Sequence, residues 1–202
     1  MVMIKKCLFL ILLFNSFFTY AQTEYKFAGL DWFQSKEKAV QKLSSYDSMA
    51  YYQEIPVDTH TTLVFFSGIL YGKDGNLITL YITDDRLMAV KLTIPTHGEP
   101  FIEFASIHEA LSEKYGPPEA TVQSLQKLNV YPGTPEAMLE ELKGNNIPWG
   151  AWWNTGFSYG NSSLYLQLNN DLDSIEVSYS TDEFSLSMKQ KRAQNGIIED
   201  LF

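Results

Sequence analysis

The chain has 202 residues, with 24 acidic and 15 basic side chains and a formal net charge of −9. This acidic excess repels the phosphate backbone of nucleic acids, so we expect no nucleic acid as a partner. One cysteine, Cys7, lies near the N-terminus. A disulfide framework and a thiolate metal site are thereby excluded from the rest of the chain.

The first residues predict a secretory signal peptide. Lys5 and Lys6 precede an apolar run from Cys7 to Phe14, and a more polar stretch then ends at Ala21. This order of positive, apolar and small residues is typical of a cleaved signal. An uncleaved membrane anchor is the alternative, but the apolar run is shorter than the ~20 residues that span a bilayer. We therefore expect residues 1–21 to be removed and the protein to be periplasmic or extracellular.

Cleavage after Ala21 removes 21 residues and two lysines, which leaves 181 residues with a net charge of −11. A chain of this length predicts a single domain over residues 22–202, with two small subdomains as the alternative. We expect no transmembrane segment after the signal.

The first elements of the mature chain are short. Tyr25 to Leu30 predicts a strand, and Ser35 is placed to cap a helix over about 36–45. A strand over about 48–55 is expected to end at Pro56.

Residues 61–94 predict three strands joined by short turns. The stretch 61–71 is rich in β-branched and aromatic residues, and Gly72 to Asn76 predicts a turn. Apolar and polar residues then alternate on both sides of a reversal at Asp84-Asp85. Alternation with short turns predicts an antiparallel meander, with one face on the core and a wetter opposite face.

The second half of the chain is also predicted to contain both helices and strands. Apolar residues at helical spacing predict a helix over about 101–115, stopped by Gly116. Residues 119–148 are expected to form an insertion with one short helix after Thr134. Further strands are predicted around 150–154, 164–168 and 175–179, with a polar helix over about 183–194. Since strands and helices occur in separate runs, the fold class is α+β, with an antiparallel meander sheet packed against helices.

Two segments carry a family resemblance. The opening Phe27-Ala28-Gly29-Leu30-Asp31-Trp32 leads into the helix capped by Ser35, and Lys114-Tyr115-Gly116-Pro117-Pro118 ends the later helix. Together they resemble small exported bacterial α+β proteins of uncharacterised function. The resemblance implies an α+β domain of the cell envelope, and it implies no activity and no site residues.

No motif for catalysis, metal binding or a cofactor is present in the sequence. His108-Glu109 begins like a zinc-helix motif, but the second histidine is replaced by Ser112. Gly-x-Ser-x-Gly and the glycine-rich nucleotide loops are absent. We therefore assign no catalytic residue, no metal ligand and no cofactor.

The acidic pairs have simpler explanations than glycoside hydrolysis, which needs two carboxylates facing one cleft. Asp84-Asp85 is explained as a turn and Glu140-Glu141 as a solvated helix face. Asp74, in Asp-Gly-Asn, matches only part of a calcium loop.

The best candidate for binding is an aromatic segment. We assign Trp149, Trp152, Trp153 and Tyr159 to a ligand- or partner-binding site. Trp152 and Trp153 are neighbours on a predicted strand, so their side chains point to opposite faces. One is expected in the core. The other is expected either to bind a sugar ring or a partner, or to be covered by the 119–148 insertion.

These features favour an exported, non-catalytic binding module whose partner is an unidentified envelope protein or polymer. Two alternatives stay open. One is a carrier of an apolar small molecule, with a cavity lined by residues such as Phe65, Phe104 and Leu166. The other is a carboxylate-based hydrolase.

Overall fold

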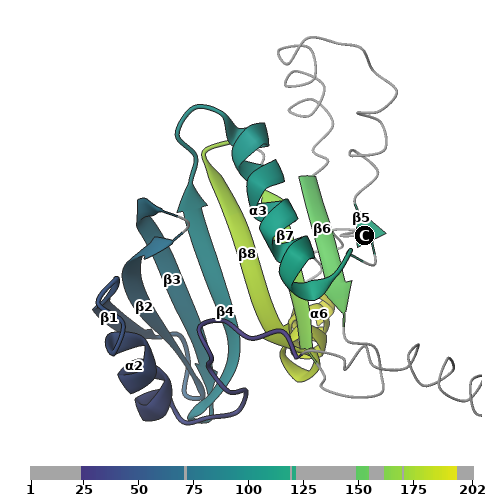
Figure 1. Ribbon diagram of the computed structural model, residues 1–202. Coiled ribbons are helices and arrows are strands. Elements are labelled where there is room, and N and C mark those ends of the chain that lie inside the picture. The colour runs from purple at the N-terminus through teal and green to yellow at the C-terminus, as the bar shows by residue number, and fades with distance from the viewer. Residues whose placement is uncertain are drawn as a thin grey trace, which may run out of the picture.

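An antiparallel sheet of eight strands organises the molecule (Figure 1), in the order β1-β2-β3-β4-β8-β7-β6-β5. The computed structural model describes residues 24–70, 72–118, 120–121, 149–154, 162–169 and 171–194. The strands are β1 (Met49–Pro56), β2 (Thr61–Leu70), β3 (Lys73–Thr83), β4 (Arg86–Pro95), β5 (Ala120–Thr121), β6 (Trp149–Asn154), β7 (Ser162–Leu168) and β8 (Ser174–Thr181). The helices of the described part are α2 (Lys36–Ser44), α3 (Pro100–Tyr115) and α6 (Asp182–Gln194).

The sheet consists of two similar halves. Each half is a helix followed by four strands: α2 precedes β1 to β4, and α3 precedes β5 to β8. The last strand of each half lies at the centre, where β4 pairs with β8 in antiparallel register. The predicted α+β class and the antiparallel meander over residues 61–94 are confirmed. The sheet thus contains two meanders, β1 to β4 and β5 to β8, and the last strand of one pairs with the last strand of the other.

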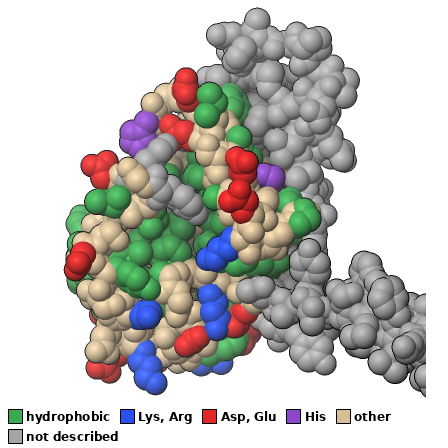
Figure 2. Space-filling model, in the orientation of Figure 1, with side chains coloured by type: hydrophobic (Ala, Val, Ile, Leu, Met, Phe, Trp, Pro, Cys, Tyr) green, Lys and Arg blue, Asp and Glu red, His purple; other side chains and the backbone are tan. Residues whose placement is uncertain are grey.

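Helices α2 and α3 lie over the same face of the sheet, which we call the inner face (Figure 1). Helix α2 contacts β1 and β4, and α3 contacts β7 and β8. Figure 2 shows apolar side chains gathered on this side between the two helices, over β2 to β4. Across the whole sheet, the strand residues that point to the inner face are almost completely buried. They include Val64, Phe66, Ile78, Leu80, Val90, Leu92, Leu164, Leu166 and Val177. Burying each such side chain stabilises the fold by about 1.5–3 kcal/mol before entropy is counted.

The start of α2 and the end of α3 are where the sequence predicts them. Ser35 caps α2, and its hydroxyl accepts a hydrogen bond from the backbone N–H of Lys38. Leu43 faces inward with Ala39, whereas Val40 is only half-buried. Gly116 ends α3 at a positive φ of 85°, which an L side chain rarely adopts.

The chain before α2 is not the strand that its sequence predicts. Residues 24–34 form an irregular segment with a turn, in which the N–H of Leu30 donates to the carbonyl oxygen of Phe27. Ala28 and Gly29 both have positive φ, which extended strand backbone does not allow. The segment still contributes to the core, because Tyr25, Phe27, Leu30 and Trp32 are buried.

The two turns predicted within residues 61–94 differ from each other. Asp84 and Asp85 both have positive φ, as a two-residue type I′ hairpin requires, so the predicted reversal is confirmed. The predicted turn from Gly72 to Asn76 is too long, since β3 already begins at Lys73. Asn76 is buried within the strand, where its side-chain amide donates to the carbonyl oxygen of Gly68 on β2.

Helix α6 lies against the opposite face, which we call the outer face. The Phe184 ring packs 5.2 Å from the ring of Tyr81, and Ser185 is hydrogen-bonded to Ser180. Tyr81 and Ser180 alternate along their strands with buried inner-face residues, so α6 covers the part of the outer face around them.

Several sequence-based expectations fall outside the described residues. They concern the signal peptide at 1–21 and almost all of the 119–148 insertion, of which only Ala120 and Thr121 are described. Among the helices that the structure describes, none is both long and apolar enough to cross a membrane.

Candidate functional site on the outer face of the sheet

The outer face carries polar and aromatic side chains where the inner face is apolar. The strand registers align two rows of residues across it. The first row is Trp152, Tyr165, Ser178, Lys91, Thr79, Phe65 and Gln53. The second row is Gly150, Gln167, Glu176, Thr93, Leu77 and Ser67. Five residues at the β6–β7–β8–β4 end form what we call the platform: Trp152, Tyr165, Gln167, Glu176 and Lys91.

Trp152 and Trp153 lie on opposite faces of β6. Trp153 is 1% exposed in the core, and its indole N–H donates to the carbonyl oxygen of Gly116 at 2.8 Å. Trp152 is half-buried on the outer face, directly opposite Tyr165 of β7. The prediction that one tryptophan enters the core is confirmed, and the core member is Trp153.

Of the other two predicted binding residues, the structure describes only the backbone of Trp149. The backbone of Trp149 begins β6 and pairs with Leu168. Tyr159 lies outside the described residues. The structure therefore places Trp152 on the candidate face and Trp153 beneath it.

The ring of Tyr165 lies over the backbone of β6. A Cβ atom built on Gly150 would lie 2.9 Å from the Tyr165 hydroxyl oxygen and 3.3 Å from its Cε2 atom. Since Tyr165 stands opposite Trp152, its ring must lean diagonally along β6 to reach Gly150. Glycine is needed at position 150 because any larger residue would displace the ring.

Charged and amide groups lie beside the two rings. Lys91 Nζ is 3.1 Å from Glu176 Oε1, and the two side chains are 32% and 25% exposed to solvent. Gln167 stands directly opposite Glu176 and also opposite Gly150. Burial raises the pKa of the Tyr165 hydroxyl above its usual value, and the negative charge of Glu176 raises it further. The hydroxyl of Tyr165 therefore stays protonated and can donate a hydrogen bond across the neutral pH range.

A second polar cluster lies on the inner side, where α3 meets β6. The His108 ring packs 5.7 Å from the Trp153 ring and stacks on Phe104. Burial lowers the pKa of His108, so the imidazole is neutral at neutral pH. Neither His108 Nε2 nor Ser112 Oγ has a hydrogen-bond partner within the described part of the chain.

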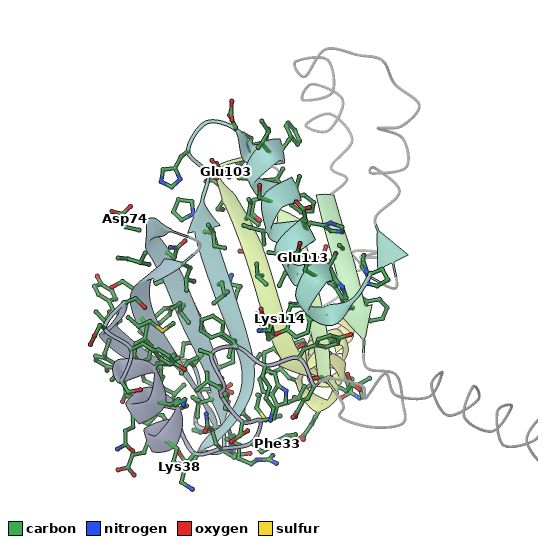
Figure 3. The ribbon with its side chains drawn as sticks, in the orientation of Figure 1. Phe33, Lys38, Asp74, Glu103, Glu113 and Lys114 are labelled. Carbon is green, nitrogen blue, oxygen red and sulfur yellow. The ribbon has the colours of Figure 1, made fainter. Side chains whose placement is uncertain are left out.

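Glu24 and Asp31 both pair with Lys26, at 2.7 and 2.8 Å, whereas three other carboxylates stand apart from one another. Figure 3 shows Asp74 at the start of β3 and Glu103 and Glu113 on separate turns of α3, well apart from one another. In the two rows of the outer face, Glu176 is the one carboxylate. No group of three or more histidine, cysteine, aspartate or glutamate side chains able to hold a metal occurs in the described residues.

The residues suggested for an apolar cavity are also separated. Phe104 and Leu166 are buried on the inner face, whereas Phe65 belongs to the first row of the outer face. These three side chains therefore do not line a common cavity.

Four of the five platform residues are not among the binding residues predicted from sequence. Tyr165 and Gln167 could be placed on the outer side of their strand, because they alternate with Leu164, Leu166 and Leu168. Nothing in the sequence indicates that Lys91 lies beside Glu176, since 85 positions separate them.

Comparisons with protein-family models, with curated proteins and with solved structures find no match to this chain. The functional argument therefore depends on the geometry of the platform.

Proposed function

We propose that this protein is an exported, non-catalytic binding domain of the cell envelope, and that it binds its partner through the platform on the outer face. The observation that carries this proposal is the placement of Trp152 beside Tyr165, with Gln167 and the Lys91–Glu176 ion pair next to them. Aromatic side chains with a polar group at hand are the residue types that dominate binding surfaces.

Export is supported by the two lysines, the apolar run and the small residue at position 21. Mature protein isolated from the native cells should begin at Gln22. Recovery of a cytoplasmic form that begins at Met1 would contradict the proposed compartment.

The arrangement of acids supports binding without catalysis. Hydrolysis by paired carboxylates needs two of them roughly 5–10 Å apart around the scissile bond. Glu176 has no second carboxylate in its two rows and is already paired with Lys91. A polar and aromatic sheet surface of this kind can hold a ligand in place.

The test is capture of envelope components by the mature protein and by two variants. Trp152→Ala removes one platform ring. Tyr52→Ala is the matched control, because Tyr52 is an aromatic residue on β1, 67% exposed, at the far end of the sheet. We expect Trp152→Ala to lose the captured components and Tyr52→Ala to keep them. Equal capture by all three proteins would remove the platform from the proposal.

A further inference from the structure

The platform combines one apolar surface with several hydrogen-bonding groups. Adjacent strands are about 4.8 Å apart, so the side chains of Trp152 and Tyr165 stand side by side on β6 and β7. Tyr165 leans over Gly150 and so extends along the sheet, which makes it part of a surface on which a flat ligand can lie.

The groups around the rings offer every type of hydrogen bond. Glu176 accepts, Lys91 donates, and the amide of Gln167 does both. Planar carboxylate and amide groups can each contact two neighbouring hydroxyls of one ligand. The Tyr165 hydroxyl adds a further donor at the edge of the same surface.

The charges of the platform cancel. Lys91 and Glu176 form an ion pair at 3.1 Å, so the platform presents no net charge. The whole chain is acidic, with a net charge of −9, which disfavours polyanions. A purely apolar ligand is disfavoured too, because it would strip water from the charged and amide groups without replacing their hydrogen bonds.

We propose that the platform binds a neutral carbohydrate, with a sugar ring stacked on Tyr165 and Trp152 and its hydroxyls hydrogen-bonded to Gln167, Glu176 and Lys91. A sugar ring has the two properties that this surface requires. Its C–H face is apolar and can pack on an aromatic ring, while its hydroxyls each donate and accept hydrogen bonds at the edge. This inference deepens the proposed function, on which it rests, by assigning the class of ligand.

The experiment is affinity electrophoresis and isothermal titration of the mature protein with laminarin, mannan, xylan, dextran and purified cell-wall sacculi. Heparin serves as the polyanionic comparison. We expect retardation by at least one neutral polysaccharide and none by heparin. Binding should change the tryptophan fluorescence, because Trp152 is at the contact.

Three variants locate the site. We expect Trp152→Ala and Gln167→Ala each to weaken binding about tenfold or more, since each removes a contact at the centre of the platform. Tyr52→Ala should bind as the native chain does. Circular dichroism and thermal unfolding check that each variant is folded, and Gln167→Ala keeps the test valid if Trp152→Ala does not fold.

The outcomes separate this inference from the proposed function. If none of the neutral probes binds while envelope capture still depends on Trp152, the carbohydrate assignment is overturned and the binding face stands. If a polysaccharide binds all variants equally, the platform is not its site. If heparin binds as tightly as the neutral polymers, the argument from charge is wrong.

Discussion

The two faces of the sheet are built from the same strands and have opposite chemistry. On β7, Leu164, Leu166 and Leu168 are buried on the inner face, while Tyr165 and Gln167 are half-buried on the outer face. On β8, Ile175 and Val177 alternate in the same way with Glu176 and Ser178. One set of alternating positions therefore holds the fold together, and the other is available for recognition.

The largest expected difference between the two faces is in the free energy of unfolding when Trp152 or Trp153 is replaced by alanine. Trp153→Ala should lower the free energy of unfolding by about 3–5 kcal/mol, because it leaves a cavity in the core and removes the hydrogen bond to Gly116. Trp152→Ala should cost less than about 1.5 kcal/mol, since its side chain is only half-buried. Urea denaturation of both variants measures the difference, and equal losses would mean that the outer face is also part of the core.

Gly150→Ala tests the contact between β6 and the Tyr165 ring. We expect a loss of about 1–3 kcal/mol, because the new methyl group would lie 2.9 Å from the Tyr165 hydroxyl oxygen and 3.1 Å from the Leu166 carbonyl oxygen. Combining Gly150→Ala with Tyr165→Ala should recover part of that loss. A double-mutant cycle from thermal unfolding gives the coupling, and a coupling of zero would show that the backbone contact alone sets the cost.

The ion pair on the outer face should contribute less. Lys91→Met and Glu176→Gln are each expected to lower the free energy of unfolding by about 1 kcal/mol or less, because both side chains remain partly exposed to solvent. The coupling measured in a double-mutant cycle should shrink as salt is added. A coupling that salt does not change would indicate a pair more buried than the structure shows.

The smallest expected effect is the pH dependence from the inner face. The folded state lowers the pKa of His108, so below the ordinary histidine pKa of about 6.5 the unfolded chain binds a proton that the folded chain does not. Stability should therefore fall as pH falls from about 6.5 toward the lowered folded pKa, and His108→Gln should remove that part of the slope. His97→Gln is the control, since His97 is exposed. An unchanged slope in His108→Gln would show that other groups set it.

Local features of the fold were accessible from the sequence, and long-range ones were not. The strands around Asp84-Asp85 and the caps at Ser35 and Gly116 depend on nearby residues, and the structure confirms them. The segment from Tyr25 to Leu30, which the sequence predicts as a strand, is not one. It is irregular because the backbone at Ala28 and Gly29 turns with positive φ, which apolar spacing does not report.

The same division applies to the candidate site. Alternation on a strand predicts that Trp152 and Trp153 separate, but which of them enters the core depends on where α3 packs. The platform exists because β4 pairs with β8, and no local pattern indicates that Lys91 of β4 lies diagonal to Glu176 of β8. Tyr165 was missed for a related reason, since its role depends on Gly150 of the neighbouring strand.

The central pairing of β4 with β8 also governs when the chain can fold during its synthesis. The ribosome delivers β4 first, and the strand that completes its hydrogen bonds is made about 80 residues later. Until then the first meander has an open edge at what becomes the middle of the sheet. Such a chain can complete its sheet only after β8 has been synthesised, which suits a polypeptide that we propose is threaded through a membrane before it folds.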